Sequence, residues 1–335
     1  MVNLFPYNTF RVAAKAERLL VLKKLQELPL EPAFILGEGA NILLTKNLNG
    51  LVIINQLRGR KTTKDKKSVY IEVASGESWR ELVKWTTENG WSGIENMAFI
   101  PGTVGAALAG NIAAYGGNFE DIFVQAEGID LKTGEAKTYY KKTCQFSYRS
   151  SAFNHKLKNI FITKVTIKLT KRPRGDTTYY SRYESLKNFL DNYGDMPPYS
   201  PKQIARAVTQ LRLDKLPDFR KIGTAGSFFK NPLVTWEKYQ KLATEIRDLQ
   251  YYPAEKLLYR AKPSKLVKIP AGRLLDELGW RGKRIGNVGT WPKHALTVVN
   301  FGGATGQEIL EFTQKMHADI LKNFEIVLEP EVKII

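Results

Sequence analysis

A run of 24 residues without a charged side chain, Asn96–Phe119, restricts the fold of this chain more than any other feature. Its length would suffice for a bilayer span, which needs about 20 apolar residues. However, Pro101 and five glycines interrupt the run, and it contains a single leucine. A membrane span is therefore not expected. Uncharged, glycine-rich backbone in an otherwise charged chain instead indicates a buried loop that a ligand approaches closely.

Net charge is the second unusual feature. The 335 residues include 51 Lys and Arg against 33 Asp and Glu, a formal charge of +18 at pH 7, which raises nucleic acid or a membrane surface as partners. The excess lies in three windows, Leu57–Lys67, Arg149–Arg182 and Lys256–Arg284. In the first window, alternating Thr, Asp and Lys favour a solvated loop or hairpin tip over a partner-binding segment. The other two windows mix bases with apolar and aromatic residues, which suits a site for an anionic ligand.

Several protein classes are not supported by the sequence. The single cysteine, Cys144, excludes an intramolecular disulfide, fits a reducing cytosol and is expected to be a buried small hydrophobe. Met1–Tyr7 has no basic segment ahead of an apolar run, so no secretory signal is expected. The three histidines have no metal-ligand spacing, so no metal site is predicted. The motifs of serine hydrolases (G-x-S-x-G), P-loop enzymes and Rossmann dehydrogenases (G-x-G-x-x-G) are absent.

Hydrophobic periodicity predicts a mixture of strands and helices. Strands are expected at Phe34–Leu36, Leu51–Asn55, Val69–Ala74, Phe123–Asp130, Lys137–Tyr140, Ile160–Leu169, Ala295–Asn300 and Glu325–Leu328. Helices are expected at Glu77–Asn89, Pro201–Leu213, Trp236–Asp248, Gly272–Leu278 and Thr305–Phe324, the last with Thr305 as its N-cap. Because the elements interleave without strict β-α-β alternation, the predicted fold class is α+β. The composition changes near Lys215–Ile222, which is a candidate domain junction.

Two glycine-containing loops suggest a phosphate-bearing ligand. Gly37-Glu38-Gly39-Ala40-Asn41 follows an expected strand, and Pro101-Gly102-Thr103-Val104-Gly105 lies in the uncharged run. Successive small residues expose backbone N–H groups that can form a concave nest for phosphate oxygens. Asn111 and Tyr115 follow as polar groups able to bond a ring system. Either loop alone is more often a simple turn, but together they favour a dinucleotide as ligand.

Motifs along nearly the whole chain resemble the UDP-N-acetylenolpyruvoylglucosamine reductase (UDP-N-acetylmuramate dehydrogenase) family. They are N-T-F at Asn8–Phe10, G-E-G-A-N at Gly37–Asn41, G-I-E-N at Gly93–Asn96, P-G-T-V-G at Pro101–Gly105, N-I-A-A-Y-G at Asn111–Gly116, C-Q-F-S-Y-R-S-S at Cys144–Ser151, K-L-P-D at Lys215–Asp218, A-G-S-F-F-K-N-P at Ala225–Pro232, A-G-R-L-L-D at Ala271–Asp276 and L-E-P-E-V at Leu328–Val332. Most of these motifs are weak individually. The joint presence of Y-R-S-S, G-S-F-F-K-N-P and L-E-P-E-V is the specific signal.

The resemblance implies a fold, two cofactors and a reaction. The fold is the FAD-binding p-cresol methylhydroxylase (vanillyl-alcohol-oxidase-like) fold, with two α+β subdomains at 1–60 plus 326–335 and at 61–214, and an α+β substrate domain at 215–325. FAD is expected at Gly37–Asn41, Pro101–Gly105, Asn111 and Tyr115. NADPH is the expected hydride donor. The implied reaction reduces UDP-N-acetylglucosamine enolpyruvate to UDP-N-acetylmuramate for peptidoglycan synthesis, in a cytoplasmic monomer that binds no nucleic acid and does not insert into a membrane.

The resemblance also implies roles for single residues. Hydride addition to an enol ether conjugated to a carboxylate needs a proton at the other carbon and stabilisation of an enolate. Ser227 matches the proton donor, and Arg149 and Glu329 match the groups that stabilise the enolate. Lys215, Asn231, His294 and a tyrosine of the Lys171–Asp195 insertion, Tyr183 or else Tyr180, match positions that hold the substrate's diphosphate. Each of these residues could instead be structural, as isolated polar residues usually are.

The chain departs from the family pattern at a few positions. His294 stands where relatives often carry an amide, Ala40 where serine is common, and Gly110 and Ala113 flank Asn111-Ile112 unusually. Backbone contacts survive alanine at such a site only if its φ is negative. Two other functions remain as alternatives, namely another FAD-dependent oxidoreductase on the same scaffold, or a basic nucleic-acid-binding protein without a chromophore.

Overall fold

The chain forms two compact units. The computed structural model describes residues 1–171, 184–253 and 266–335. The first unit comprises Met1–Glu17, Gly39–Asn49 and Lys215–Ile335, and the second comprises Arg18–Glu38 and Gly50–Asp214. The three-part division expected from the sequence, with boundaries after residues 60, 214 and 325, stays a prediction.

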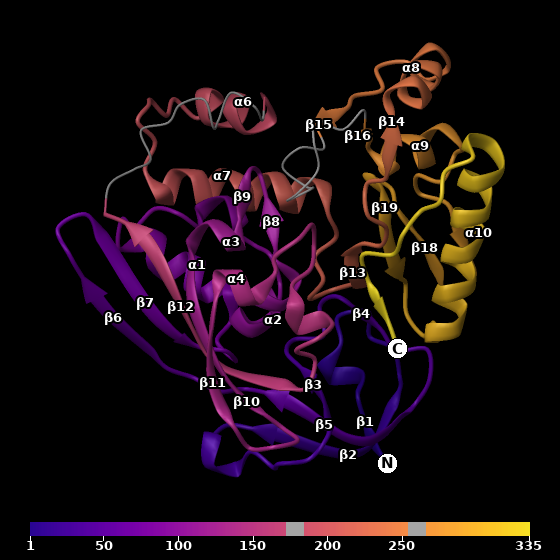
Figure 1. The fold of residues 1–335 in the computed structure, drawn as a ribbon. Helices are drawn as coiled ribbons and strands as arrows, with labels where there is room; N and C mark the ends of the chain where they lie inside the picture. The colour runs from indigo at the N-terminus through magenta and orange to yellow at the C-terminus, as the bar shows by residue number, and fades with distance from the viewer. Residues whose placement is uncertain (172–183, 254–265) are drawn as a thin grey trace. The chain divides into compact units, whose positions relative to one another are not determined.

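A five-stranded antiparallel sheet of order β11-β10-β12-β7-β6 forms the centre of the second unit (Figure 1). In β7, Val69, Ile71 and Val73 are fully buried, whereas Tyr70 and Glu72 between them are partly exposed. This alternation arises because successive side chains of a strand point to opposite faces. The strands are β6 (Arg60–Lys64), β7 (Ser68–Ala74), β10 (Phe123–Asp130), β11 (Ala136–Tyr140) and β12 (Ile160–Thr170).

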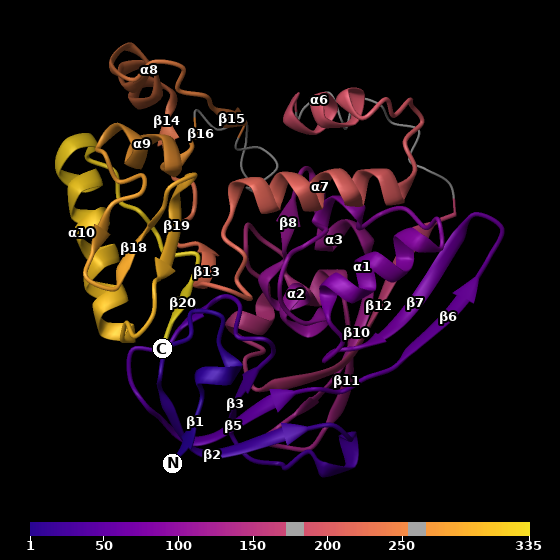
Figure 2. The same cartoon turned by 180° about the vertical axis from the view of Figure 1, so that it is seen from behind.

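Helices pack on one face of this sheet and share its apolar core (Figures 1 and 2). In α1, Trp79, Leu82 and Val83 lie at helical spacing and are buried, and Trp79 Nε1 donates to the carbonyl of Met97 at 3.0 Å. The helices are α1 (Trp79–Glu88), α2 (Val104–Gly110), α3 (Phe119–Ile122), α4 (Lys141–Cys144), α6 (Glu184–Asn192) and α7 (Pro201–Lys215). The remaining strands of this region are β2 (Lys15–Leu22), β3 (Ala33–Leu36), β5 (Leu48–Asn55), β8 (Ala113–Ala114) and β9 (Gly117–Asn118), with β3 parallel to β5.

Part of the basic window Leu57–Lys67 is a strand rather than a loop. Arg60–Lys64 form β6, which pairs with β7 at the sheet edge, and only the turn at its end matches the expected hairpin tip. The guanidinium of Arg60 lies 4.8 Å from the ring centroid of Trp85, and Lys64 Nζ lies 4.9 Å from that of Trp91. Cations over aromatic rings stabilise the strand, and charged side chains on an edge strand oppose pairing with another chain. Arg60 and Lys64 therefore have contacts within the fold.

The uncharged run contains a helix that the sequence pattern does not predict. Thr103 caps α2, and its hydroxyl accepts a hydrogen bond from Ala106 N at 3.4 Å. The glycines around the helix suggest a loop, but the A-A-L-A sequence between them favours a helix because alanine and leucine have high helix propensity. The cap and the burial of Val104 and Leu108 in the core complete the helix.

The first unit combines a four-stranded antiparallel sheet with helices. The sheet order is β13-β19-β18-β17, and α9 and α10 contact it (Figure 2). The strands of this unit are β1 (Val2–Asn3), β4 (Ile42–Leu43), β13 (Gly223–Ser227), β14 (Leu233–Thr235), β15 (Tyr252–Pro253), β16 (Leu266–Lys268), β17 (Arg284–Ile285), β18 (Val288–Trp291), β19 (His294–Asn300) and β20 (Lys333–Ile334). Its helices are α8 (Trp236–Glu245), α9 (Ala271–Glu277) and α10 (Gly306–Phe324).

The sequence prediction is confirmed at the start of α10 and wrong after its end. Thr305 is the N-cap, as predicted, and forms a reciprocal capping box with Glu308. The prediction of a strand at Glu325–Leu328 is wrong. Glu325 adopts a left-handed conformation with φ of 53° that ends the helix, and the segment after it pairs with no strand. Ile326 and Leu328 are buried against the core, which produces the same alternation as a strand.

Candidate active site

The first glycine loop, Gly37–Asn41, has the backbone of an anion-binding nest. Gly39 has a φ of 61°, and a Cβ there would lie 2.2 Å from the carbonyl oxygen of Tyr7, so only glycine fits. Within the described chain, no hydrogen bond uses the backbone N–H groups of Glu38, Gly39, Ala40 or Asn41. Four successive donors around a left-handed residue suit a phosphate group. These residues therefore fit the pyrophosphate of a dinucleotide cofactor.

The second glycine loop, Pro101–Gly105, packs against the first and has a different role. Glu38 Oε2 accepts a hydrogen bond from Gly102 N at 2.9 Å, and a Cβ on Gly37 would lie 2.5 Å from Thr103 Oγ1. Val104 N donates to the carbonyl of Glu77, and Gly105 N to that of Ser75. Three of the N–H groups expected to face a ligand are thus used within the protein. The loop therefore supports the first loop instead of forming a second nest.

Asn111 is held within the fold. Its Nδ2 donates to the carbonyl of Ser147 at 2.9 Å and its Oδ1 accepts from Glu120 N at 3.2 Å, so its amide orders the backbone. Asn111 and Tyr115 both have left-handed backbones, with φ of 42° and 45°. Ala113 does not have a left-handed backbone, so alanine is accommodated at this position without strain.

Arg149 is oriented by the backbone next to that turn. Its Nη1 donates to the carbonyl of Ala113 at 2.9 Å, and the side chain is half-buried. Arg212 on α7 adds a second guanidinium whose charge interacts with that of Arg149. Burial, and then the charge of Arg149, lower the pKa of Arg212 to about 10, and its buried Nε has no partner in the described residues. Two neighbouring, partly buried cations favour an anionic ligand.

Arg212 was not predicted, although a sequence signal exists. It lies four residues after Val208 and eight after Ile204, and both of these are buried on the inner face of α7. A cation at this helical spacing points to the same face as the core residues. The helical spacing of Arg212 from these residues therefore indicates a charged side chain on the inner face of α7.

Ser227 and Glu329 come from segments that bond to each other in the first unit. Ser227 ends β13 and is half-buried, and its hydroxyl makes no hydrogen bond to any residue that the structure describes. Three residues on, Lys230 N donates to the carbonyl of Glu329 at 2.9 Å, and Lys230 Nζ lies 3.2 Å from Glu329 Oε2. The Glu329 side chain remains largely exposed. A hydroxyl and a carboxylate able to meet a ligand are therefore present in one unit.

The residues expected at the diphosphate divide into two kinds. His294 and Lys215 share the charged neighbours Asp276 and Arg281. The Oδ1 atom of Asn231 instead accepts a hydrogen bond from Ala271 N at 3.0 Å and so caps α9. Burial, and then Lys215, hold the pKa of His294 at about 4. Burial, and then Arg281, lower the pKa of Lys215. Tyr183 and Tyr180 lie outside the described residues.

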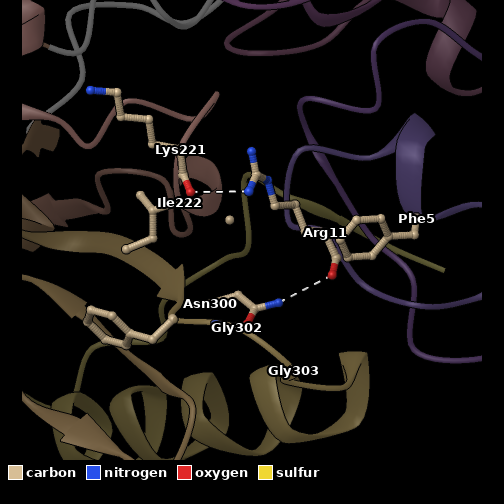
Figure 3. A pocket seen from close by; sticks show the side chains of 9 residues that line it. Phe5, Arg11, Lys221, Ile222, Asn300, Gly302 and Gly303 are labelled. Carbon is tan, nitrogen blue, oxygen red and sulfur yellow. Dashed lines mark hydrogen bonds between the residues drawn. The ribbon is translucent and has the colours of Figure 1, made fainter.

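Other groups in the fold have structural roles. The Cys144 thiol is fully buried, and burial raises its pKa to about 12, so it is no nucleophile at neutral pH. A pocket of about 150 Å³ between Phe5, Arg11, Ile222 and Asn300 holds none of the predicted site residues (Figure 3). There Arg11 donates to the carbonyls of Lys221 and Arg220, and Asn300 Nδ2 donates to that of Phe10. These bonds join the pocket walls.

Comparison with known proteins places the chain among enzymes. Residues 29–139 match the FAD binding domain family, and residues 217–335 match the family "UDP-N-acetylenolpyruvoylglucosamine reductase, C-terminal domain". The chain is 37% identical to the UDP-N-acetylenolpyruvoylglucosamine reductase of Flavobacterium johnsoniae, over 98% of this chain and 97% of the relative. The corresponding Pseudomonas aeruginosa enzyme is 35% identical over 98% and 96%. The chain belongs to the UDP-N-acetylenolpyruvoylglucosamine reductase family.

A solved structure agrees with this family. The UDP-N-acetylenolpyruvylglucosamine reductase of Thermus caldophilus is 25% identical, covers 99% of this chain and 97% of its own, and gives a TM-score of 0.65. The resemblance, the α+β fold class with an FAD-binding domain and the flavoenzyme class are thereby confirmed. In the present chain, both glycine loops lie in the region that matches the FAD binding domain family. Ser227, His294 and Glu329 lie in the region that matches the C-terminal domain family. In the described part of the chain, no helix is long and apolar enough to cross a bilayer.

Proposed function

We propose that the chain reduces the enolpyruvyl ether of UDP-N-acetylglucosamine to UDP-N-acetylmuramate, with FAD as bound cofactor and NADPH as reductant. The full-length likeness to reductases of this name carries the proposal. The nest at Glu38–Asn41 supports it, because its unused N–H donors suit the FAD pyrophosphate. When bound, FAD supplies the hydride that NADPH has delivered to it. The other steps belong to side chains of the protein.

Ser227 is the proposed proton donor. Its hydroxyl is half-buried and makes no bond in the described residues that would compete with a substrate. A hydroxyl is a weak acid, so donation requires neighbours that stabilise the oxygen left behind. Lys230 places an ammonium group within the same short segment, next to Glu329.

Arg149 and Glu329 are the proposed partners of the substrate's carboxyl group. A planar guanidinium can donate two parallel hydrogen bonds to a carboxylate, and negative charge grows on that carboxylate as hydride is added. The hydrogen bond from Arg149 to Ala113 orients the guanidinium in advance. Glu329, held by Lys230, can order a water or share a proton at the same group.

Lys215 and His294 are the proposed diphosphate contacts, together with Asn231 and a tyrosine of the insertion, Tyr183 or Tyr180. Lys215 supplies a positive charge, and a buried neutral imidazole can donate or accept a hydrogen bond. Asn231 Oδ1 is used by Ala271, so only its Nδ2 is proposed to reach a ligand. The substrate carries the matching negative charge.

We expect a cytoplasmic monomer that binds no nucleic acid. Two bases of β6, Arg60 and Lys64, already contact Trp85, Trp91 and Glu77, which weakens the case for a nucleic-acid surface. Size-exclusion chromatography with light scattering tests the monomer. Salt-dependent binding to unrelated DNA sequences would contradict the expectation.

The decisive experiment follows the flavin colour. The purified protein is expected to be yellow, or to become so with FAD, and to bleach with NADPH under anaerobic conditions. Re-oxidation by the enolpyruvyl nucleotide supports the proposed reaction. A protein whose flavin is re-oxidised by oxygen alone would instead be another oxidoreductase on this scaffold, and a chain that cannot be loaded with FAD would overturn both.

A further inference from the structure

Ser227 and Thr297 lie directly opposite each other on β13 and β19. On the next pair, Phe228 N donates to the carbonyl of Leu296 at 2.8 Å. Hydrogen-bonded and non-hydrogen-bonded pairs alternate in antiparallel strands, so Ser227 and Thr297 form the non-hydrogen-bonded kind. The Cα atoms of such pairs are about 4.5 Å apart and their side chains share one face. The two side chains therefore lie on the same face, although their hydroxyls do not bond to each other in this structure.

The Thr297 hydroxyl connects this pair to a buried ring. Thr297 is fully buried, and its Oγ1 lies 3.2 Å from His294 Nδ1. No other hydrogen bond of this hydroxyl occurs in the described chain. Because a hydroxyl offers one donor and two acceptor sites, it can accept from the ring and also donate to Ser227 when a rotation of the serine side chain brings the two oxygens together.

Burial and nearby charges keep the His294 ring neutral. Lys215 at the end of α7 and Arg281 after α9 are the cations that act on the ring, and Asp276 on α9 is the opposing anion. Burial and these cations keep the ring neutral at pH 7, with a pKa of about 4. The relay requires the tautomer with its hydrogen on Nδ1, which then donates to Thr297 Oγ1 and leaves Nε2 as the acceptor.

We propose that Thr297 and His294 relay a proton to Ser227 as Ser227 protonates the substrate. The inference rests on the proposed role of Ser227. The O–H bond of Ser227 breaks as the C–H bond forms, the Thr297 proton passes to the serine oxygen, and the Nδ1 proton of His294 passes to Thr297. Nε2 takes a proton from solvent, either directly or through Lys215 at the end of α7. One solvent proton is consumed per C=C bond reduced, and proton exchange restores the ring tautomer.

The relay explains why a weak acid can act here. If the transfers occur together, no serine alkoxide is left in the site, so Ser227 does not need a lowered pKa of its own. Thr297 and His294 are positioning residues, because they act through Ser227 and need not touch the reacting carbon. A simple diphosphate contact by His294 would leave the proton transfer unchanged.

The first test is Thr297→Val in the FAD-loaded enzyme, which keeps the side-chain shape and removes the hydroxyl. Flavin reduction by NADPH and the KM for the enolpyruvyl nucleotide should stay within about two-fold, while flavin re-oxidation by that nucleotide slows by about 10². Thr297→Ser should restore most of the rate. The matched control is Thr313→Val, because Thr313 is equally buried in the same unit but bonds only to the carbonyl of Leu310.

Solvent isotope effects separate a relay from a packing role. In mixtures of H₂O and D₂O, a plot of the re-oxidation rate against the deuterium fraction should be curved for the wild type, because several protons move together. The same plot should be linear for Thr297→Val. His294→Gln should slow the same step, and the double variant should be no slower than Thr297→Val alone, since both act on one path.

The possible outcomes distinguish failure of the relay from failure of the proposed role of Ser227 as proton donor. If Thr297→Val re-oxidises flavin at the wild-type rate while Ser227→Ala does not, the relay is wrong and Ser227 remains the donor. Equal slowing in Thr297→Val and Thr297→Ser would assign the effect to packing and also overturn the relay. Rapid re-oxidation in Ser227→Ala would instead contradict the proposed role of Ser227 itself.

Discussion

Single polar side chains in this protein divide into those bonded within the fold and those left for a ligand. Asn111 bonds to Ser147, and Asn231 bonds to Ala271, 40 positions away along the chain. Ser227 makes no such bond in the described segments. A sequence motif marks all three positions equally, because it carries no information on hydrogen-bond partners distant in the chain. The strongest mechanistic prediction therefore concerns Ser227.

Ser227→Ala should separate the two half-reactions. Flavin reduction by NADPH is expected to be unchanged, while reduction of the enolpyruvyl group falls by roughly 10²–10⁴, the usual contribution of a positioned acid. Stopped-flow absorbance of the flavin measures both steps. Normal turnover would show that another group donates the proton.

The pKa of His294 predicts how stability depends on pH. The unfolded chain takes up a proton near the ordinary value of 6.5, but the folded chain does so only near 4. Between these values the unfolded state binds more protons, so the free energy of unfolding falls as pH drops from about 6.5 to 4. The expected loss from this group at pH 5 is about 2 kcal/mol.

Urea denaturation at pH 5 and pH 7.5 checks this, with His294→Gln as the comparison. The variant should lose less stability than the wild type between the two pH values. An equal loss in both proteins would mean that another group titrates.

At the scale of elements, close backbone contacts decide where glycine is required. Gly37 faces Thr103, which also caps α2, so its loop and that helix depend on each other. Gly110 at the end of α2 meets only Ile112 Cγ2, at 3.8 Å, and has no left-handed φ. The sequence marks both as glycines near a predicted cofactor loop. Only the packing separates them.

Gly37→Ala should weaken FAD binding and Gly110→Ala should not. The new Cβ at position 37 would lie 2.5 Å from Thr103 Oγ1, and moving that hydroxyl would remove the α2 cap. Overpacking of this kind costs about 1–3 kcal/mol. The FAD content of the purified variants and the dissociation constant for added FAD report the effect. Wild-type affinity in Gly37→Ala would show that the loops separate easily.

At the scale of the whole molecule, binding of FAD is expected to be linked to folding. The FAD binding domain match spans 29–139, which includes Gly39–Asn49 of the first unit and most of the sheet of the second. A ligand that binds only the folded state adds about 2.7 kcal/mol of stability at a concentration 100 times its dissociation constant. The Tm should therefore rise with FAD concentration, as thermal denaturation of protein stripped of FAD will measure. A Tm independent of FAD would contradict this linkage.

The sequence by itself determined the α+β class, most helices and strands, the Thr305 cap and the family motifs that carry the chemistry. These depend on local periodicity and on residue types that a short segment displays. Only the tertiary structure decided that Arg60–Lys64 pair as an edge strand, that 325–328 is not a strand, and that Arg212 joins Arg149. It also decided that Thr297 pairs with Ser227 across neighbouring strands and bonds to His294. The physical reason is that strand register, burial and charge proximity are set by contacts between segments far apart in the chain.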